Sequence, residues 1–435
     1  MRGRRTALAG ALALLLATAA VVGGVVGAAS QAPTVSVFAS WTGDEGAVFG
    51  AVLDDFTERT GIEVEYQGTT AQREVLMSQV RSGSPPDVAI LSSPGELAEY
   101  AARDEILPLG AALGEQRDAY REPWLTPLSG AEAADVYWVP VKVDLKSVVW
   151  YDPARLSPDE AVSLAGDGDN WCLGMGSDAT SGWPGTDWVE DLLLQSAGPD
   201  AYESWATGTP GSWTTEEMAA AWRGVAQVLT GQGSTRATES LTQDIGVASG
   251  GLFAAEPRCA LDHQSSFIRG LYGAEAPGDG VPEAAFLASS TVLPGTGGRQ
   301  RGWEVAGDFA GMFRDTQEAR RLIGYLASAE AQEVWARAVP DDVPSPMFAN
   351  SRVPRDVYAD DPAGGAVADL LRGPGPHCLD ASDAMPPAMR DAFQQAVLRL
   401  LAAPDEPPDG LLAELEVARA AVTEDGGVWL SSVCG

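Results

Sequence analysis

The stretch that most restricts the possible folds of this chain is residues 139–152, VPVKVDLKSVVWYD. Two apolar runs rich in β-forming residues flank the charged residues Lys142, Asp144 and Lys146. Their alternate spacing places the three charged side chains on one face of an extended segment. An apolar strand with charges at its centre predicts a strand that leaves one domain and enters another, with the charges at the crossing. The alternative is an edge strand whose charged face is solvated.

Composition excludes several classes of protein. The chain has 435 residues, 45% of them hydrophobic, which is enough for at least two globular domains. Its 61 acidic and 28 basic residues give a formal net charge of -33. Such a charge disfavours phosphate backbones and anionic lipid surfaces, so nucleic-acid binding is not expected. Two histidines and four cysteines, none in C-x-x-C spacing, leave little material for a metal cluster. No metal or cofactor is expected.

The N-terminus has the pattern of an export signal. Arg2, Arg4 and Arg5 precede an apolar run over residues 7–29, whose length fits either a cleaved signal peptide or a membrane anchor. Residues 1–30 are therefore predicted to direct the chain out of the cytoplasm. Their removal would take away three positive charges and bring the net charge to -36 (-33 minus 3).

Strands and helices alternate in the first part of the chain. Residues 35–39, 62–66 and 87–91 are short apolar runs separated by amphipathic helical patterns. This β-α-β-α-β order predicts a parallel sheet with helices on both faces. In such sheets ligands bind beyond the carboxyl ends of the strands. The residues that follow the first and third runs are Trp41, Glu45, Ser92 and Ser93. Alternatively, Ser93 only caps the helix that begins at residue 94.

Further elements are expected along the rest of the chain. Residues 172–175 are predicted to form a strand, 177–188 a loop rich in glycine and proline, and 189–195 a helix. Other helices are expected over residues 213–229, 315–335 with a break near Ser328, 385–401 and 411–422.

Several stretches resemble the family 1 extracellular solute-binding proteins, which are the sugar receptors of ABC importers. Residues 139–152 resemble the crossover segment of that family, "GxPYKxDxKSLVWYN", and residues 171–195 (WCLGMGSDATSGWPGTDWVEDLLLQ) look like a block of its α-glucoside-type branch. Weaker similarities are WTGDE at 41–45 to "WSGxE", residues 251–268 to "MFxxPPxxWLHxQGxFI", and VAGDFAGMF at 305–313 to the second crossover, "VAGDxxVMF". A helical insert around "TWDEL", usual in the family after the first crossover, is missing here.

The resemblance implies an α/β, two-lobed periplasmic-binding-protein fold of type II. Each lobe is expected to hold a mainly parallel sheet flanked by helices, with crossover strands between the lobes. The implied division is a leader at 1–30, one lobe from 34–141 and 306–350, a second lobe from 142–305 and 351–435, and a hinge at about 140–147 and 303–309.

The function that the resemblance implies is that of the extracytoplasmic component of an ABC importer. It would bind a sugar, such as an α-glucoside or another oligosaccharide, in the cleft between the lobes and deliver it to the permease. Aromatic faces would pack on the C–H faces of a pyranose, and charged and polar groups would hydrogen-bond its hydroxyls. The expected ligand-binding residues are Trp41, Glu45, Ser92, Ser93, Lys142, Asp144, Lys146, Trp183, Asp187, Trp188, His263 and Asp308. Trp188 and His263 have the alternative of a packing or structural role.

The cysteines and the N-terminus add further expectations. In an oxidising compartment four cysteines allow three disulfide connectivities. The implied fold favours Cys172 with Cys259 and Cys378 with Cys434, because each pair then joins segments of one lobe. No cysteine precedes Cys172, so the lipid anchor common in such receptors is not expected. A monomer is expected, either held at the membrane by an uncleaved N-terminal segment or secreted.

Two alternatives to a transport receptor remain at this point. One is a glycoside hydrolase that uses paired carboxylates among Glu45, Asp144, Asp187 and Asp308. The other is a membrane-tethered sensor that binds a solute and signals to a partner protein. The receptor, which is not an enzyme, is preferred because the similar blocks occur in the order that the family requires.

Overall fold

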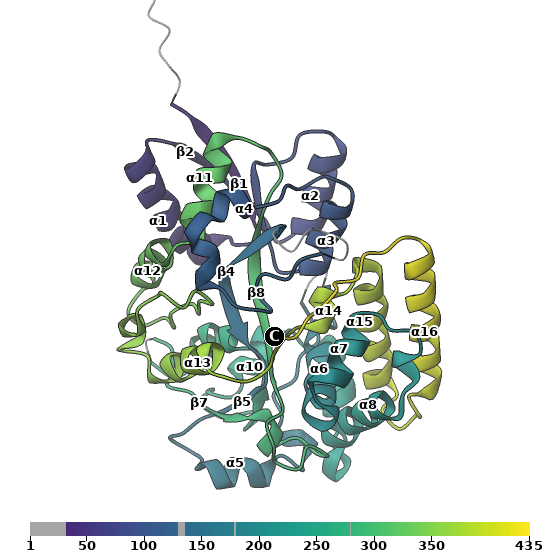
Figure 1. Cartoon of the computed structure of the whole chain (residues 1–435). Coiled ribbons are helices and arrows are strands. Elements are labelled where there is room, and N and C mark those ends of the chain that lie inside the picture. Colours follow the sequence, from purple (N-terminus) through teal and green to yellow (C-terminus); the bar gives the residue numbers. More distant parts are fainter. Residues whose placement is uncertain (1–31, 129–134, 178–179, 279) are drawn as a thin grey trace, which may run out of the picture.

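The computed structural model describes residues 32–128, 135–177, 180–278 and 280–435 (Figure 1). Its larger sheet has the strand order β2-β1-β3-β8-β4, and β9 pairs with β8 off this path. The strands are β1 (Thr34–Ala39), β2 (Glu63–Gly68), β3 (Val88–Leu91), β4 (Trp138–Leu145), β8 (Trp303–Met312) and β9 (His377–Leu379). β1 is parallel to β2 and β3, whereas β8 is antiparallel to β3 and β4.

The first helices form where the sequence predicts them. They are α1 (Gly43–Thr60), α2 (Gln72–Arg81) and α3 (Pro94–Ala102). α1 buries Phe49, Val52 and Phe56 at helical spacing and ends at Gly61, whose φ of 69° suits a residue without a Cβ. In Figure 1, α1 and α11 lie to one side of the larger sheet, and α2 and α3 lie to the other. The predicted parallel β-α-β-α-β unit is confirmed.

A second, smaller sheet has the order β6-β5-β7. Its strands are β5 (Val148–Tyr151), β6 (Asp262–His263) and β7 (Ala285–Ala288), and both pairings are antiparallel. A mainly parallel sheet was expected here, and the difference arises because β5 pairs with two strands from later, irregular stretches and not through helical crossovers. The chain passes from the larger sheet to the smaller one at Lys146 and Ser147, between β4 and β5.

The charged face of β4 is not solvated, although β4 is the last strand on its edge of the larger sheet. Asp144 and Lys146 are buried, and Lys142 is largely buried. The crossing strand therefore carries its charges into the interior, which excludes the edge strand with a solvated charged face.

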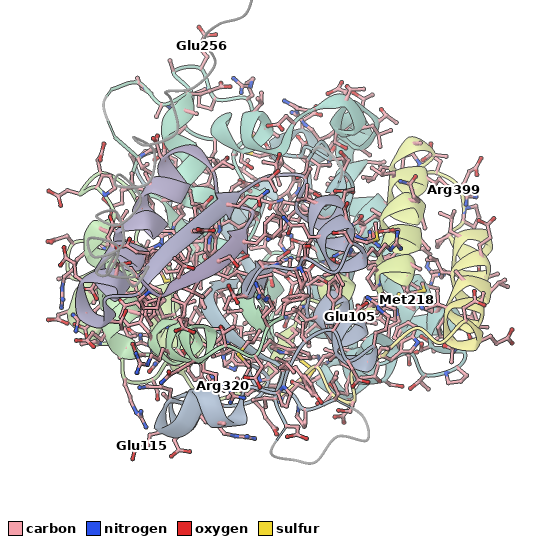
Figure 2. All side chains as sticks on the ribbon, turned by 90° about the horizontal axis from the view of Figure 1, so that it is seen from above. Glu105, Glu115, Met218, Glu256, Arg320 and Arg399 are labelled. Atoms are coloured by element: carbon pink, nitrogen blue, oxygen red, sulfur yellow. A yellow bond between two sulfur atoms is a disulfide. The ribbon has the colours of Figure 1, made fainter. Side chains whose placement is uncertain are left out.

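A helical layer packs beside the lower half of β8 (Figure 1). It contains α6 (Trp183–Ala197), α7 (Pro199–Ala206), α8 (Glu216–Leu229), α14 (Ala381–Ala384), α15 (Pro387–Ala402) and α16 (Asp409–Glu424). Phe393 of α15 lies edge-on to Trp205 and Trp213, with ring centroids 5.6 and 5.0 Å apart. Figure 2 shows charged side chains such as Glu115, Glu256 and Arg399 projecting from the outside of the molecule.

The remaining elements are short or connect these layers. The helices are α4 (Gly110–Leu113), α5 (Pro158–Leu164), α9 (Arg236–Glu239), α10 (Ile245–Gly250), α11 (Gln317–Leu326), α12 (Ala329–Ala338) and α13 (Pro362–Arg372). Short 3₁₀ segments lie at Gly114–Ala119, Gly168–Asn170, Ser212–Thr214, Gly231–Gly233, Ser240–Thr242, Ser266–Ala274, Ser289–Thr291 and Arg355–Tyr358. Ser328 caps α12, so the predicted break is confirmed.

Two local predictions are wrong. Residues 172–175 form no strand, and among the described residues nearby the only bridges are isolated ones at the flanking residues Trp171 and Gly176. The predicted loop at 177–188 ends earlier, because α6 begins at Trp183 with Pro184 in its first turn, a position that tolerates proline. Trp183, Asp187 and Trp188 therefore all lie on one helix.

Both disulfides are confirmed. Cys172 is bonded to Cys259 and Cys378 to Cys434, across 87 and 56 residues of sequence. The second bond ties the C-terminal end of the chain to β9.

The predicted leader at residues 1–30 lies outside the described residues. Among the described residues, no helix has the length and apolar character needed to cross a membrane. The division of the chain into two lobes stays a prediction.

Candidate functional site

A cavity of about 760 Å³ lies against the paired strands β4 and β8. These strands pair from Trp138 opposite Gly311 to Leu145 opposite Val305, and Lys142 lies opposite Asp308. Seven of the residues expected to bind a ligand line this cavity: Glu45, Ser92, Lys142, Asp144, Lys146, Trp183 and Asp308. β4, β8 and the first turn of α1 thus meet at this cavity.

Lys142 is paired with two carboxylates at the cavity. Its Nζ lies 2.9 Å from Glu45 Oε1 and 3.4 Å from Asp308 Oδ2. The same ammonium lies 5.2 Å from the ring centroid of Trp41. Burial lowers the pKa of Lys142, but the charges of Asp308 and Glu45 outweigh this effect and raise it. Lys142 is therefore a fixed cation with a carboxylate on either side, and all three groups can hydrogen-bond a polar ligand.

Asp144 is the next charged residue along β4. Its Oδ1 accepts a hydrogen bond from Ser266 Oγ at 2.7 Å. Burial raises the pKa of Asp144 to about 6, although Lys142 and Ser266 act in the opposite direction. A carboxyl group with a pKa of about 6 only accepts hydrogen bonds above that pH. Below it, the protonated group can both donate and accept them.

Replacing Asp144 with asparagine is expected to flatten the dependence of stability on pH. The pKa of Asp144 is about 6 in the folded protein and about 3.9 in an unfolded chain, so the folded state binds more protons between these values. The free energy of unfolding therefore falls as the pH rises from about 4 to about 6. In Asp144→Asn this fall should be smaller by up to about 3 kcal/mol, measured by urea unfolding at a series of pH values.

Ser266→Ala provides the matched control for this effect. It removes the hydroxyl donor that lowers the pKa of Asp144, so the pH-dependent loss of stability should extend to higher pH. An Asp144→Asn profile that follows the wild-type profile throughout would show that Asp144 does not titrate in this window.

Lys146 lies deeper, at the point where the chain leaves the larger sheet. Its side chain is 6% exposed, its Nζ is 2.9 Å from Asp187 Oδ1, and it also contacts Asp380 Oδ2. The ammonium lies 5.5 Å from the ring centroid of Trp183. Burial lowers the pKa of Lys146, but the charges of Asp187, Asp380 and further carboxylates raise it well above its usual range. Lys146 therefore joins β4, α6 and the start of α14 in the interior.

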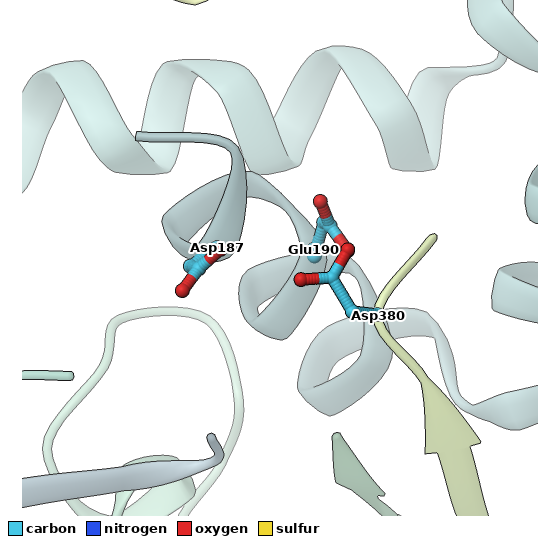
Figure 3. Close-up of side chains that lie close together, drawn as sticks. All are labelled: Asp187, Glu190 and Asp380. Carbon is cyan, nitrogen blue, oxygen red and sulfur yellow. The ribbon is translucent and has the colours of Figure 1, made fainter. Parts of the chain in front are cut away.

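Three buried carboxylates around Lys146 could be mistaken for a metal site. Figure 3 shows Asp187 and Glu190 on α6 close to Asp380, and one oxygen of each lies within 4.8 Å of the others. Two of the three already bind the Lys146 ammonium. Glu190 Oε2 accepts hydrogen bonds from the backbone N–H of Ala381 at 2.6 Å and from Tyr202 Oη at 3.2 Å. A metal ion would have to displace these partners, so the donor set fits an ion-pair cluster better than a metal.

The acids of this cluster do not all ionise alike. Burial raises the pKa of Glu190 well above its usual range, and the neighbouring Asp380 adds to the rise. Burial likewise raises the pKa of Asp187 to about 6, although Lys146 counteracts it. Burial opposes the ionisation of Asp380 too, but Lys146 holds its pKa below the usual range. Among these three carboxyls, Lys146 thus favours the ionised form most at Asp380, and burial opposes ionisation most strongly at Glu190.

Five expected ligand-binding residues do not line the cavity. Trp41 is buried against Phe49 and Trp335, with ring centroids 4.7 and 4.9 Å away. Ser93 caps α3, since its Oγ accepts from the backbone N–H of Glu96 at 3.1 Å. Ser93 is thus a helix cap, which was the alternative considered from the sequence.

The other three residues lie in the interior behind the cavity. Asp187 is buried against Lys146. Trp188 packs edge-on against Trp171, with ring centroids 4.8 Å apart. His263 Nε2 is 2.8 Å from Asp191 Oδ2, and its ring contacts Trp188. Trp188 and His263 therefore have the packing and structural roles that were given as alternatives from the sequence.

The cavity also contains residues that the motifs did not indicate. Ser266, Phe267, Arg269 and Leu271 come from the 3₁₀ turn after β6, and Asp380, Ser382 and Asp383 come from the start of α14. Arg390 and Gln394 of α15 complete that side. A sequence signal existed for α14: the short run HCL at 377–379 is followed by DASD at 380–383, three polar residues and one alanine, before the next helix.

Comparison with known proteins agrees with the fold. The family model for "Bacterial extracellular solute-binding protein" matches residues 39–333. Solved structures share the architecture at low sequence identity. A chitin oligosaccharide binding protein has a TM-score of 0.67 and 16% identity, covering 90% of this chain and 99% of its own. Maltose-bound MalE3 of T. maritima has a TM-score of 0.65 and 16% identity, covering 90% of this chain and all of its own. These likenesses establish the type II fold.

Two curated relatives are more similar in sequence. The alpha-glucosides-binding periplasmic protein AglE of Rhizobium meliloti (strain 1021) is 30% identical over 385 residues, covering 81% of this chain and 80% of AglE. The osmoprotective compounds-binding protein GgtB of Synechocystis sp. is 32% identical over 329 residues, covering 69% of this chain and 74% of GgtB. With the family model and a relative at this identity both spanning most of the described residues, the chain belongs to the bacterial extracellular solute-binding protein family.

Proposed function

We propose that this protein is the extracytoplasmic substrate-binding component of an ABC importer, and that it binds an α-glucoside in the cavity beside β4 and β8. The observation that carries the proposal is the meeting of fixed charges and an aromatic face at one cavity. Lys142 with Glu45 and Asp308 offers donors and acceptors for hydroxyls, and Trp183 offers a flat apolar surface. AglE is named for binding α-glucosides, and MalE3 was solved with maltose.

Ligand binding is expected to close two lobes over the cavity, with the hinge near residues 140–147 and 303–309. Contacts between the two predicted lobes support this. Ser93 Oγ donates to the backbone carbonyl of Asp383 at 2.8 Å, and Arg73 Nη1 lies 3.1 Å from Asp391. Trp41, Ser93 and Asp187 then act as positioning residues behind the residues that touch the sugar. Permease subunits would recognise the closed, monomeric form at the cell surface, where the N-terminal segment anchors the protein or is removed.

A catalytic function is set aside. The family to which the chain belongs is one of solute-binding proteins, and the curated relatives are named as binding proteins and not as enzymes. The carboxylates considered for hydrolysis also have other partners: Glu45 and Asp308 pair with Lys142, Asp144 with Ser266, and Asp187 with Lys146.

The test is a titration of the purified protein with maltose, trehalose, sucrose and a longer maltodextrin by calorimetry, with tryptophan fluorescence in parallel. Saturable binding of at least one α-glucoside is the expected result. Absence of binding across this panel would overturn the α-glucoside assignment and favour another solute, or a sensor that signals to a partner protein.

Trp183→Ala is expected to weaken the binding of the α-glucoside by about tenfold or more, since an aromatic side chain buried by a ligand contributes roughly 1.5–3 kcal/mol. Calorimetry measures the loss. Trp429→Ala is the matched control, because Trp429 lies against Gly208 and Thr423 and does not line the cavity. Equal affinities of the Trp183 and Trp429 variants would mean that Trp183 does not contact the sugar.

A further inference from the structure

The cavity gathers an unusual share of the exposed apolar surface. Within the described ranges, the large apolar side chains that are exposed are Val162, Val247, Phe267, Leu271, Val343 and Val417. Phe267, Leu271 and Val343 all line the cavity, with exposed fractions of 40%, 39% and 41%. Single exposed apolar residues are normal on a protein surface, but several in one concavity mark a binding surface.

These apolar side chains come from two segments that meet at the cavity. Phe267 and Leu271 lie on the turn Ser266–Ala274, and Val343 lies in the segment after α12. The backbone N–H of Val281, just beyond the turn, donates to the carbonyl of Asp342 at 3.2 Å. The neighbours of Val343 that also line the cavity are Val339, Pro340, Pro344, Ser345, Pro346 and Met347, all of them apolar except Ser345. The two segments thus both contribute exposed apolar side chains to the cavity lining, and Phe267, Leu271 and Val343 are together called its apolar end.

The chemistry of this apolar end differs from that of the residues proposed to hold the sugar. A pyranose presents flat C–H faces and a rim of hydroxyls, which suit aromatic rings and hydrogen-bonding groups. Apart from the ring of Phe267, the side chains of Leu271, Val343 and the neighbouring prolines provide neither a flat ring nor a hydrogen bond. Sugar hydroxyls placed against them would lose their water without compensation. Hydrocarbon groups, in contrast, gain free energy in proportion to the apolar area that they bury there.

We propose that the ligand is a glycoside with a hydrocarbon-rich aglycone: its sugar binds the charged residues on β4 and β8, and its aglycone binds the apolar end of the cavity. This proposal rests on the proposed function, because it takes the charged residues as the sugar site. Lys142 and Asp308 supply the polar contacts, and Phe267, Leu271 and Val343 enclose the aglycone. The packing of Phe267 against Trp183, with ring centroids 6.0 Å apart, makes the two parts of the site continuous.

The experiment compares ligands that differ only in the aglycone. Methyl, n-butyl and n-hexyl α-D-glucopyranoside, together with maltose, are titrated into the purified full-length protein by calorimetry. Affinity is expected to rise with alkyl length by about fourfold for each methylene that becomes buried. The heat capacity change on binding should become more negative along the same series, as burial of apolar surface requires.

A double variant, Leu271→Asn with Val343→Thr, tests where the alkyl chain binds. Both side chains are exposed, so the changes leave the core intact. The variant should retain the affinity for methyl glucoside and lose most of the gain with alkyl length. Val417→Thr on α16, 71% exposed and outside the cavity lining, is the matched control and should behave as the wild type.

The outcomes separate this proposal from the proposed function. Binding of maltose or methyl glucoside without a gain from longer alkyl chains overturns the aglycone proposal and leaves the sugar-receptor function standing. A gain with alkyl length that persists unchanged in the double variant also overturns it, because the alkyl chain then binds elsewhere. If none of the four compounds binds, both the aglycone proposal and the α-glucoside function fail.

Discussion

Lys146→Met is expected to destabilise the protein by about 3–5 kcal/mol, because removing one partner of a buried ion pair leaves its counter-charges without compensation. Lys146 is 6% exposed at its side chain, and it faces Asp187 and Asp380, which are 2% and 3% exposed. Methionine has a similar length, so the change removes the charge and little volume. Urea unfolding of the protein without ligand at pH 7 measures the loss.

Two comparisons make this prediction specific. Lys142→Met should cost less, because its partners Glu45 and Asp308 are 55% and 17% exposed and are better solvated than the partners of Lys146. In Lys146→Met the loss should shrink as the pH falls: without the ammonium, the pKa values of the buried carboxyls rise further, and protonation removes their charge. A loss below about 1 kcal/mol at pH 7 would show that the cluster is neutralised by protons even in the wild type.

Removal of the Cys172–Cys259 disulfide by a double change to alanine is expected to lower the free energy of unfolding by about 4 kcal/mol. The bond closes a loop of 87 residues, and restricting so long a loop in the unfolded chain accounts for most of this stabilisation in the chain-entropy model. Alanine is the suitable replacement, since both cysteines are buried and serine would bury a hydroxyl. Urea unfolding under non-reducing conditions gives the difference.

The corresponding change at Cys378 and Cys434 is the internal control. Its loop spans 56 residues, so the expected loss is only slightly smaller, because the loop term depends on the logarithm of length. Reducing agent should lower the stability of either double variant by the amount assigned to the bond that remains. An alanine pair at 172 and 259 as stable as the wild type would mean that strain in the folded state offsets the entropic gain.

Local sequence patterns were sufficient for much of the fold. The alternating strands and helices of residues 34–102 follow from hydrophobic periodicity and turn residues, which act over a few neighbours along the chain. The charged triplet on residues 142–146 identified the passage between two sheets, because no ordinary core strand carries three charges on one face. The block at 171–195 was correctly matched to the family. Because of its glycines and proline, however, the helix was predicted to begin at residue 189, whereas α6 begins at Trp183.

Which side chains reach the cavity depended on the direction in which each helix faces. Trp183, Asp187 and Trp188 are five residues apart at most, yet they lie respectively at the cavity, against Lys146 and against Trp171. A helix turns about 100° with each residue, so neighbours in sequence point in different directions. Because residues 177–188 were predicted to form a loop, the sequence offered no basis for predicting the different directions of these three side chains.

The sequence by itself determined the family, the parallel β-α-β-α-β unit and the crossing strand. These depend on local periodicity and on motifs that are contiguous in the chain. Only the tertiary structure decided that the smaller sheet is antiparallel, that Asp380 and Arg390 join the cavity, and that apolar side chains from two separate segments gather at one end of it. The physical reason is that such contacts join residues far apart in sequence, and they exist only once the elements have packed.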